Sequence, residues 1–259
     1  MAAESDTLPE SRIGIDMETD HYVQSAEVYD ILSSPHWQAR RESVLSALQA
    51  VQDLSGTILD VGAGTGTGLR IIADAVPNAM ILALEPSASM RVGLMTKVLL
   101  DEELRRRVTV EARPIQGAML PDKLSAALVC GCIGYLDRGE RLEMWQTLAN
   151  RIVPEGLVLA DVMMWDRPQA VPSTRIAAVD VGELQYEMWV SGTPGDDDIM
   201  LWDMGCRILR REQILRSFHV VREWHTFGIS QLMEEAAIAG FRGEVIKDSP
   251  VPAVTLKLS

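Results

Sequence analysis

The central part of the chain alternates short apolar runs with longer segments of helical length. Apolar runs with little polar alternation are typical of strands that are buried on both faces, and helices between them are typical of a parallel sheet with right-handed crossovers. The pattern therefore predicts an α/β core over residues 57–165. We expect strands at 57–61, 79–84, 108–112, 126–130 and 156–162, and helices at 67–75, 87–100 and 139–152.

Between about residues 166 and 228 the hydrophobic period changes to two. Two alternating runs, 184–190 and 200–208, flank the turn-rich segment 193–198, and a third extended run covers 218–224. Such alternation predicts strands with one covered face, so we expect an inserted antiparallel β layer. It contains half of the six tryptophans: Trp189, Trp202 and Trp224.

The two ends of the chain are predicted to be mainly helical. A short helix is expected at 22–32, broken at Ser33-Ser34-Pro35, and a second from about residue 36 to 53. At the other end a helix over 230–240, with Ser230 as N-cap and Gly240 as stop, precedes strands at 241–246 and 253–258. The first 20 residues lack a periodic pattern, so we expect them to become ordered only with a ligand or partner. The expected division is 1–56 lid and helices, 57–165 core, 166–228 insertion and 229–259 completion of the core.

Composition narrows the class of protein. The 259 residues are 47% hydrophobic and 24% charged, as in ordinary globular proteins, and carry a net charge of −13. A negative field of this size disfavours nucleic acid and anionic membranes as partners. The sequence has only three cysteines, without zinc-type spacing, so we expect neither a disulfide framework nor a bound metal. It also has no signal-peptide pattern, so we expect a cytoplasmic protein.

The most informative segment is 58–68, with the sequence ILDVGAGTGTG. An apolar strand leads to Asp60, glycines follow at alternate positions, and a helix begins, so the backbone can approach a nucleotide closely. The dinucleotide fingerprint would need glycine at Thr67, and the P-loop would need a G-K-[ST] ending. A nicotinamide-dependent oxidoreductase is therefore disfavoured.

This segment resembles the first motif of class I S-adenosylmethionine-dependent methyltransferases, D-x-G-x-G-x-G after a strand. The resemblance covers residues 22–258 and implies a Rossmann-like, mostly parallel seven-stranded sheet with an antiparallel last strand. It implies that Glu85 meets the ribose and that the loop 113–121 meets the adenine, although Gly117-Ala118 stand where the family often has aspartate. It also places 130–136 opposite the methyl donor. The implied cofactor-binding residues are Asp60, Gly62, Ala63, Gly64, Glu85, Pro86, Met90, Gly117, Ala118, Met119, Cys130 and Tyr135.

The segment 22–32 also resembles the N-terminal lid helix of small-molecule methyltransferases, notably N-methyltransferases of amino sugars and antibiotic intermediates. The resemblance implies methyl transfer from S-adenosylmethionine, with S-adenosylhomocysteine as product, to an amine of a secondary metabolite. It is also compatible with a homodimer. An O-methyltransferase and a non-catalytic cofactor-binding or assembly protein remain alternatives. Protein and nucleic-acid methylation are less favoured, because Cys130-Gly131-Cys132-Ile133 replaces the N-P-P-[YF] motif.

Methyl transfer from a sulfonium is a direct displacement, so alignment of the reactants is the main requirement. Tyr22, Tyr29 and Tyr135 are the expected positioning residues, because aromatic faces suit a cationic cofactor. A hydroxyl acceptor would need a general base and an amine would not. We assign His225 as the candidate base of the site. For each histidine of the chain, a structural role is a simpler interpretation than a catalytic one. The other candidate bases are His21, His36, His219 and Asp161.

Overall fold

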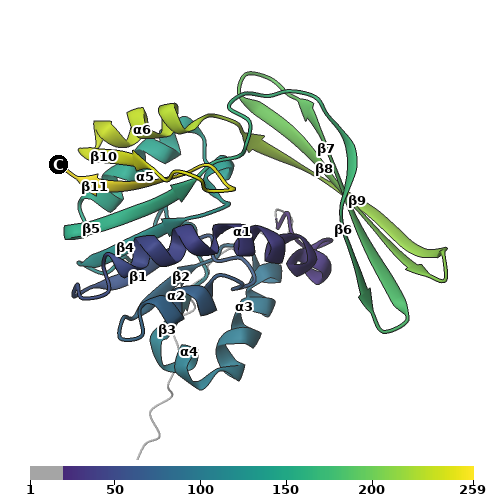
Figure 1. The fold of residues 1–259 in the computed structure, drawn as a ribbon, viewed down its shortest axis with the longest axis horizontal. Helices are drawn as coiled ribbons and strands as arrows, with labels where there is room; N and C mark the ends of the chain where they lie inside the picture. The colour runs from purple at the N-terminus through teal and green to yellow at the C-terminus, as the bar shows by residue number, and fades with distance from the viewer. Residues whose placement is uncertain (1–19) are drawn as a thin grey trace, which may run out of the picture.

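The computed structural model describes residues 20–259, so the expectation about the first 20 residues lies almost wholly outside the described part of the chain. Two lobes are visible in Figure 1: a layered α/β body and a long antiparallel sheet that projects from it. The elements, in chain order, are η2 (Ala26–Val28), α1 (Tyr29–Gln49), β1 (Thr57–Val61), α2 (Leu69–Ala75), β2 (Ile81–Leu84), α3 (Ala88–Leu100), α4 (Glu102–Arg107), β3 (Val108–Glu111), β4 (Leu124–Val129), η3 (Ile133–Tyr135), α5 (Arg138–Ala149), β5 (Ile152–Asp161), β6 (Val171–Val181), β7 (Leu184–Pro194), β8 (Ile199–Arg210), β9 (Gln213–His225), α6 (Ile229–Ile238), β10 (Phe241–Val245) and β11 (Ala253–Leu258).

The body contains a seven-stranded sheet in the order β10-β11-β5-β4-β1-β2-β3. Strands β1 to β5 pair in parallel, whereas β11 runs antiparallel to both β10 and β5. The predicted sheet, with its antiparallel last strand, is therefore confirmed. Strand β4 is buried along its whole length, which agrees with a sequence that is apolar except at Ser125.

Helices cover both faces of this sheet, and each face has its own core. On one face α1 and α2, together with α3 and α4, pack against alternate residues such as Ile58 of β1 and Leu128 of β4. On the other face α5 and α6 pack against the intervening residues, such as Leu59 and Val129. This alternation of side chains between the two cores places Asp60, the residue after Leu59, on the side of α1.

The insertion forms a separate four-stranded antiparallel sheet in the order β6-β7-β8-β9. Three of its strands correspond to the predicted alternating runs, but β6 was not predicted. Nearly all of β6 is exposed, so its sequence carries no apolar period that could indicate a strand. The sheet packs on the start of the N-terminal helix through a third core, formed by Val28, Met188, Cys206 and Ile208.

Several predicted helix boundaries are wrong. Helix α1 continues through Pro35, because Pro35 is exposed and the flanking turns are held by buried residues such as Ser33 and Val44. That helix also ends at Gln49 rather than near residue 53. The expected N-cap at Ser230 is wrong as well, because α6 begins at Ile229 and Gly228 is its N-cap.

Two further points concern the helices of the described chain. The short helix α4 was not predicted; its first N–H groups, from Glu103 and Leu104, are bonded by the Asp101 carboxylate. None of the helices in residues 20–259 is long and apolar enough to cross a membrane.

Candidate functional site

The glycine loop follows β1, as the sequence predicts. Gly62, Gly64 and Gly66 all have positive φ angles, of 69°, 59° and 80°, a conformation that L side chains rarely adopt. A Cβ atom at Gly62 would approach the Cβ of Cys132 to 2.8 Å. The loop is therefore a tight turn against which Cys132 and Leu94 pack closely, and its glycines permit both the left-handed backbone and this close approach.

Glu85 joins this loop to the turn after β2. One carboxylate oxygen accepts the Gly64 N–H at 2.7 Å, and the other accepts the Ser87 N–H at 2.7 Å. The side chain is buried, and burial raises the pKa of Glu85 above its ordinary value despite these two bonds. Glu85 thus fixes the relative position of two loops at the carboxyl ends of β1 and β2.

Asp60 is the residue of this loop that lacks a partner. Its side chain is 1% exposed, and Oδ2 has no hydrogen-bond partner among the described residues. Burial, together with the negative charge of Glu85, raises the pKa of Asp60 to about 7. A buried carboxyl that is left unsatisfied is costly, and a cationic group beside it would satisfy the orphaned oxygen. The ammonium group of S-adenosylmethionine fits this requirement.

The other predicted cofactor residues occupy different surroundings. Ala63 is buried in the turn that follows β1, Met90 is buried in the first turn of α3, and Pro86 is exposed beside Glu85. Gly117 has a φ of 80° with open space where a Cβ would stand, and Met119 is exposed. The loop therefore exposes its backbone at Gly117, whereas the N–H groups of Ala118 and Met119 are bonded to the Ile115 carbonyl at 3.3 Å and to Glu111 at 3.4 Å.

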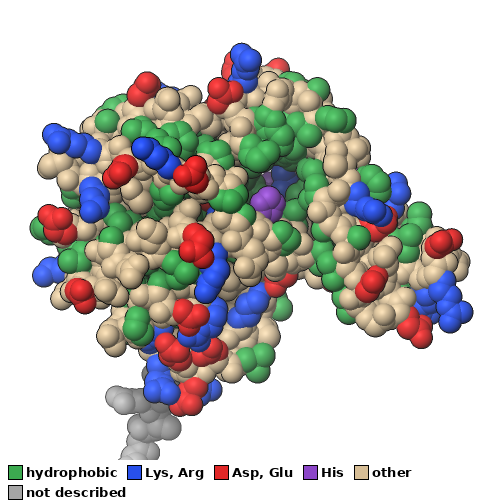
Figure 2. Space-filling model, in the orientation of Figure 1, with side chains coloured by type: hydrophobic (Ala, Val, Ile, Leu, Met, Phe, Trp, Pro, Cys, Tyr) green, Lys and Arg blue, Asp and Glu red, His purple; other side chains and the backbone are tan. Residues whose placement is uncertain are grey.

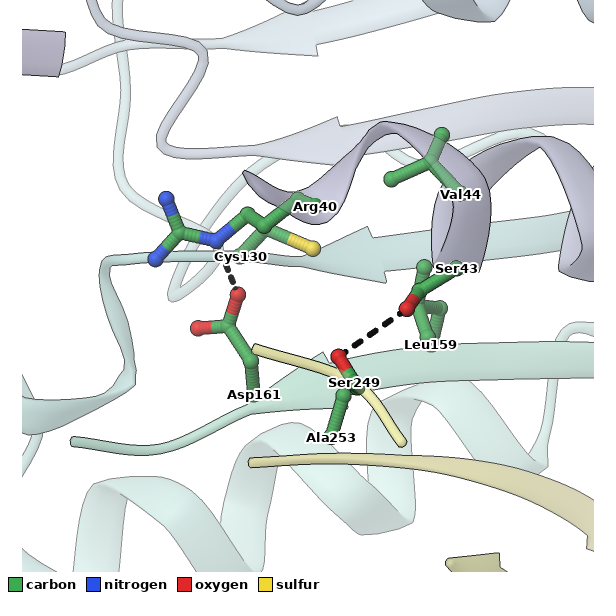
Figure 3. A pocket seen from close by; sticks show the side chains of 8 residues that line it. All are labelled: Arg40, Ser43, Val44, Cys130, Leu159, Asp161, Ser249 and Ala253. Atoms are coloured by element: carbon green, nitrogen blue, oxygen red, sulfur yellow. Dashed lines mark hydrogen bonds and ion pairs between the residues drawn. The ribbon is translucent and has the colours of Figure 1, made fainter. Parts of the chain in front are cut away.

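The two cysteines after β4 face opposite directions. Cys130 is buried next to Arg40 and Asp161, where it lines a cavity of about 10 Å³ beneath α1 (Figure 3). Such a cavity has room for a single water molecule and for no cofactor. Cys132, which the sequence analysis did not assign, donates its thiol to the Val61 carbonyl at 3.1 Å and lies against the glycine loop.

The three predicted tyrosines form one cluster above the loop. The rings of Tyr22 and Tyr29 lie edge to face with centroids 5.5 Å apart, and the Tyr22 hydroxyl bonds the Tyr135 hydroxyl at 2.7 Å. Tyr29 approaches the glycine loop: a Cβ at Gly64 would lie 3.8 Å from its ring. The cluster therefore connects the lid, the glycine loop and the exit of β4. Figure 2 shows that the surface is hollowed where the body meets the projecting sheet.

Tyr22 and Tyr29 are neutral hydroxyl groups at physiological pH. Burial raises the pKa of Tyr22 well above its ordinary value, and burial also raises the pKa of Tyr29 to about 12. They can orient a ligand through their hydroxyl groups and ring faces. They cannot accept its proton as phenolates.

Three of the candidate bases are engaged by charged partners, whereas His21 is exposed and directly precedes Tyr22 of the cluster. His225 is bonded to the Asp198 carboxylate, with Nδ1 2.8 Å from Oδ1, and His219 to the Asp203 carboxylate at 3.1 Å. Asp161 forms an ion pair with Arg40 and accepts the Gly131 N–H at 2.8 Å (Figure 3). In residues 20–259 the tyrosine hydroxyls have no carboxylate or imidazole partner.

The histidine nearest to Arg40 is also a weak base. Burial and the neighbouring Arg40 guanidinium lower the pKa of His36. The described chain, residues 20–259, contains no group of three or more His, Cys, Asp or Glu side chains arranged to hold a metal ion.

Three further residues complete this region: Asp20 and Arg222 were not predicted from the sequence, and Trp224 was expected only as one of the tryptophans of the insertion. Asp20 bonds the start of α3, accepting from Ser87 Oγ at 2.7 Å and from the Ser89 N–H at 3.0 Å. Trp224 of the insertion stacks edge to face on Tyr135 with centroids 4.8 Å apart. Arg222 lies over the Tyr22 ring, with its guanidinium carbon 3.8 Å from the centroid. Arg222 and Trp224 lie two positions apart on β9, so their side chains share one face of the strand, and this spacing was the signal in the sequence that could have linked them.

No protein-family model matches this sequence, and no curated protein matches it. Solved structures do match its fold. DesVI from Streptomyces venezuelae superposes with a TM-score of 0.74 at 18% identity, covering 90% of this chain and 98% of DesVI. The sugar N-methyltransferase KedS8 from Streptoalloteichus sp. superposes with a TM-score of 0.71 at 17% identity, covering 100% of this chain and 98% of KedS8.

A third structure was solved with its cofactor. The S-adenosylmethionine-bound form of CalS10, an amino pentose methyltransferase of calicheamicin biosynthesis in Micromonospora echinaspora, gives a TM-score of 0.71 at 14% identity, over 88% of this chain and 97% of CalS10. The fold is thus that of the class I methyltransferases, with an N-terminal helix and a separate antiparallel sheet. This confirms the fold class that the motifs indicated.

Proposed function

We propose that this protein transfers a methyl group from S-adenosylmethionine to an amine of a small molecule, such as an amino sugar or related secondary metabolite. The observation that carries the proposal is Asp60: a buried carboxyl with an unpaired oxygen beneath a left-handed glycine loop. A loop of this shape with an orphaned acid suits a cofactor that bears both a nucleoside and a cationic amino group. The sugar N-methyltransferases of the same fold support the choice of acceptor.

The residues that would hold the cofactor follow from the geometry of the loops. Asp60 would accept the ammonium group, and Glu85 retains a free lone pair on each oxygen for the ribose hydroxyls. The adenine would meet the backbone of 117–119, since no aspartate is present there. The tyrosine cluster would cover the sulfonium end.

When bound, S-adenosylmethionine supplies an electrophilic methyl group on a positively charged sulfur. The protein has to align the amine lone pair with that methyl group and exclude water, and positioning can supply about 7–11 kcal/mol in favourable cases. In this proposal the hydroxyl pair of Tyr22 and Tyr135, 2.7 Å apart, would orient the amine. Because both described histidines of the insertion are bonded to aspartates, the acceptor would lose its proton to water before it binds. This arrangement favours an amine over a hydroxyl acceptor.

Calorimetric titration with S-adenosylmethionine, S-adenosylhomocysteine and NADH tests the cofactor assignment. We expect micromolar binding of the first two and none of NADH, with binding lost in Asp60→Ala and Gly62→Val variants that keep the native circular dichroism. Binding of NADH alone would indicate an oxidoreductase. If none of the three compounds binds, the result would indicate a non-catalytic protein. A panel of amino sugars and matched phenols then decides between N- and O-methylation.

The functional division that we propose assigns residues 1–56 to the N-terminal lid and helices, residues 57–165 and 229–259 to the cofactor-binding core, and residues 166–228 to the substrate-side insertion.

We further propose a homodimer. Its support is a set of exposed apolar side chains on the edge strands β6 and β9, and light scattering of the purified protein would test it. A cytoplasmic location is consistent with three unpaired cysteines. The apolar side chains are Ile176, Val179, Val181, Ile214, Leu215 and Val221.

A further inference from the structure

Two arginines of the described chain are buried, and they differ in how their charge is compensated. Arg141 is 0% exposed, and its guanidinium forms two bonds with the Glu235 carboxylate, at 2.8 and 2.9 Å. Arg222 is 7% exposed and has no carboxylate within ion-pairing distance among residues 20–259. A buried charge without an opposite charge is expensive, so its position requires an explanation.

The partners of Arg222 lie in the lid and at the exit of β4. Its guanidinium covers the face of Tyr22 at 3.8 Å, and Nη2 donates to Ser25 Oγ at 2.5 Å and to the His21 carbonyl at 3.5 Å. Nη1 reaches the Tyr135 hydroxyl at 3.5 Å, and Nε is buried without a partner. One side chain of the insertion therefore contacts both members of the tyrosine hydroxyl pair.

The position of Arg222 follows from the alternation along β9. This strand pairs regularly with β8 from Arg216 to His225, so residues of even number share one face. Phe218 packs in the core beneath the lid, and Trp224 contacts Tyr135. Arg216, on the same face, bonds Glu27 of the lid at 2.5 Å, but both of these side chains are about half exposed.

We propose that Arg222 is a positioning residue for methyl transfer: it holds the lid segment 20–28 closed and fixes Tyr22 against Tyr135. The inference rests on the proposed function and adds to it the means by which the insertion controls the reaction centre. The planar guanidinium can cover an aromatic ring and donate to Ser25 at the same time. A lysine ammonium at this position can keep the charge but cannot do both.

The lid also reaches the cofactor loops at its other end. Asp20 bonds Ser87 and the Ser89 N–H next to Glu85, so release of Tyr22 would loosen a segment that is tied to the ribose side of the site. We therefore expect the state of Arg222 to determine how long S-adenosylhomocysteine remains bound.

Hydrogen–deuterium exchange and stopped-flow dissociation of S-adenosylhomocysteine test this inference on the full-length chain. Arg222→Met should accelerate exchange in 20–28 and speed dissociation by about tenfold to hundredfold, with Arg222→Lys intermediate. Arg216→Met is the matched control: it lies on the same strand and contacts the same lid, but through an exposed ion pair, so both rates should change less than about threefold.

A double-variant cycle separates positioning from a general structural role. In a Tyr22→Leu background the ring and hydroxyl that Arg222 holds are absent and only its bonds to Ser25 and the His21 carbonyl remain, so adding Arg222→Met should change the dissociation rate by a smaller factor than in the wild type. Additive effects would overturn the proposal, as would equal exchange in Arg222→Met and Arg216→Met. If the wild-type protein does not bind S-adenosylhomocysteine, the proposed function fails and with it the role in methyl transfer, whereas exchange in the free protein still decides whether Arg222 holds the lid.

Discussion

Replacement of Asp60 by asparagine should stabilise the free protein and weaken cofactor binding. Asp60 is 1% exposed with an unpaired oxygen, and its pKa is raised from 3.8 to about 7. In the unfolded chain the carboxyl loses its proton near pH 4, whereas in the folded protein it keeps the proton until about pH 7. The contribution of this group to stability is therefore fully present below pH 4 and is lost as the pH rises to 7.

The magnitude follows from the shift in pKa. Roughly three pKa units at 1.36 kcal/mol each correspond to about 4 kcal/mol as an upper estimate for a fully buried group. Asparagine is nearly isosteric and never ionises, so Asp60→Asn should exceed the wild type in unfolding free energy by up to this amount at pH 8. The difference should shrink towards zero at pH 4.

Urea unfolding of both proteins at pH 4, 6 and 8 measures this difference, and calorimetry with S-adenosylhomocysteine measures the second effect. Loss of a charged hydrogen bond worth about 1.5–3 kcal/mol predicts roughly tenfold to hundredfold weaker binding. Wild-type affinity should also rise between pH 6 and 8, as Asp60 ionises, and the variant should lack this dependence. A variant that is equally destabilised at all three pH values, or that binds as tightly as the wild type, would refute the reasoning.

Three other changes test separate parts of the structure. Gly134→Ala places a methyl group inside the indole of Trp224. We therefore expect the free energy of unfolding measured with urea to fall by about 1–3 kcal/mol and the tryptophan fluorescence to shift to the red. An unchanged spectrum would contradict this contact. Glu235→Ala leaves the guanidinium of Arg141 buried and unpaired, so the free energy of unfolding should fall by about 3–5 kcal/mol, whereas loss of an exposed ion pair lowers it by under about 1 kcal/mol. A small decrease would show that water reaches the Arg141–Glu235 pair. His225→Ala should leave S-adenosylhomocysteine affinity and methyl transfer within about threefold, and a large loss of turnover alone would restore that histidine as a base.

Much of the body could be predicted from the sequence because its signals are local. Apolar runs buried on both faces define strands β1, β2 and β4 without knowledge of their neighbours. The glycine spacing after Asp60 likewise reports a backbone conformation that needs positive φ at Gly62, Gly64 and Gly66. A local conformational requirement leaves its trace in the residues that meet it.

Features that depend on distant partners could not be predicted in this way. The exposed strand β6 exists because β7 pairs with it, and α1 continues through Pro35 because buried side chains on both sides hold it. Arg222 is some 200 residues from its lid partners, Ser25 and the His21 carbonyl, in the chain.

The choice of residues at the site illustrates the same division. The sequence determined a glycine loop, an acid at each of two strand ends and three tyrosines suited to a cationic cofactor. Only the tertiary structure decided that Cys132 rather than Cys130 faces the loop, and that His225 is bonded to Asp198. The reason is physical: strand alternation and helix periodicity specify which face a side chain occupies, but the group opposite that face belongs to another part of the chain.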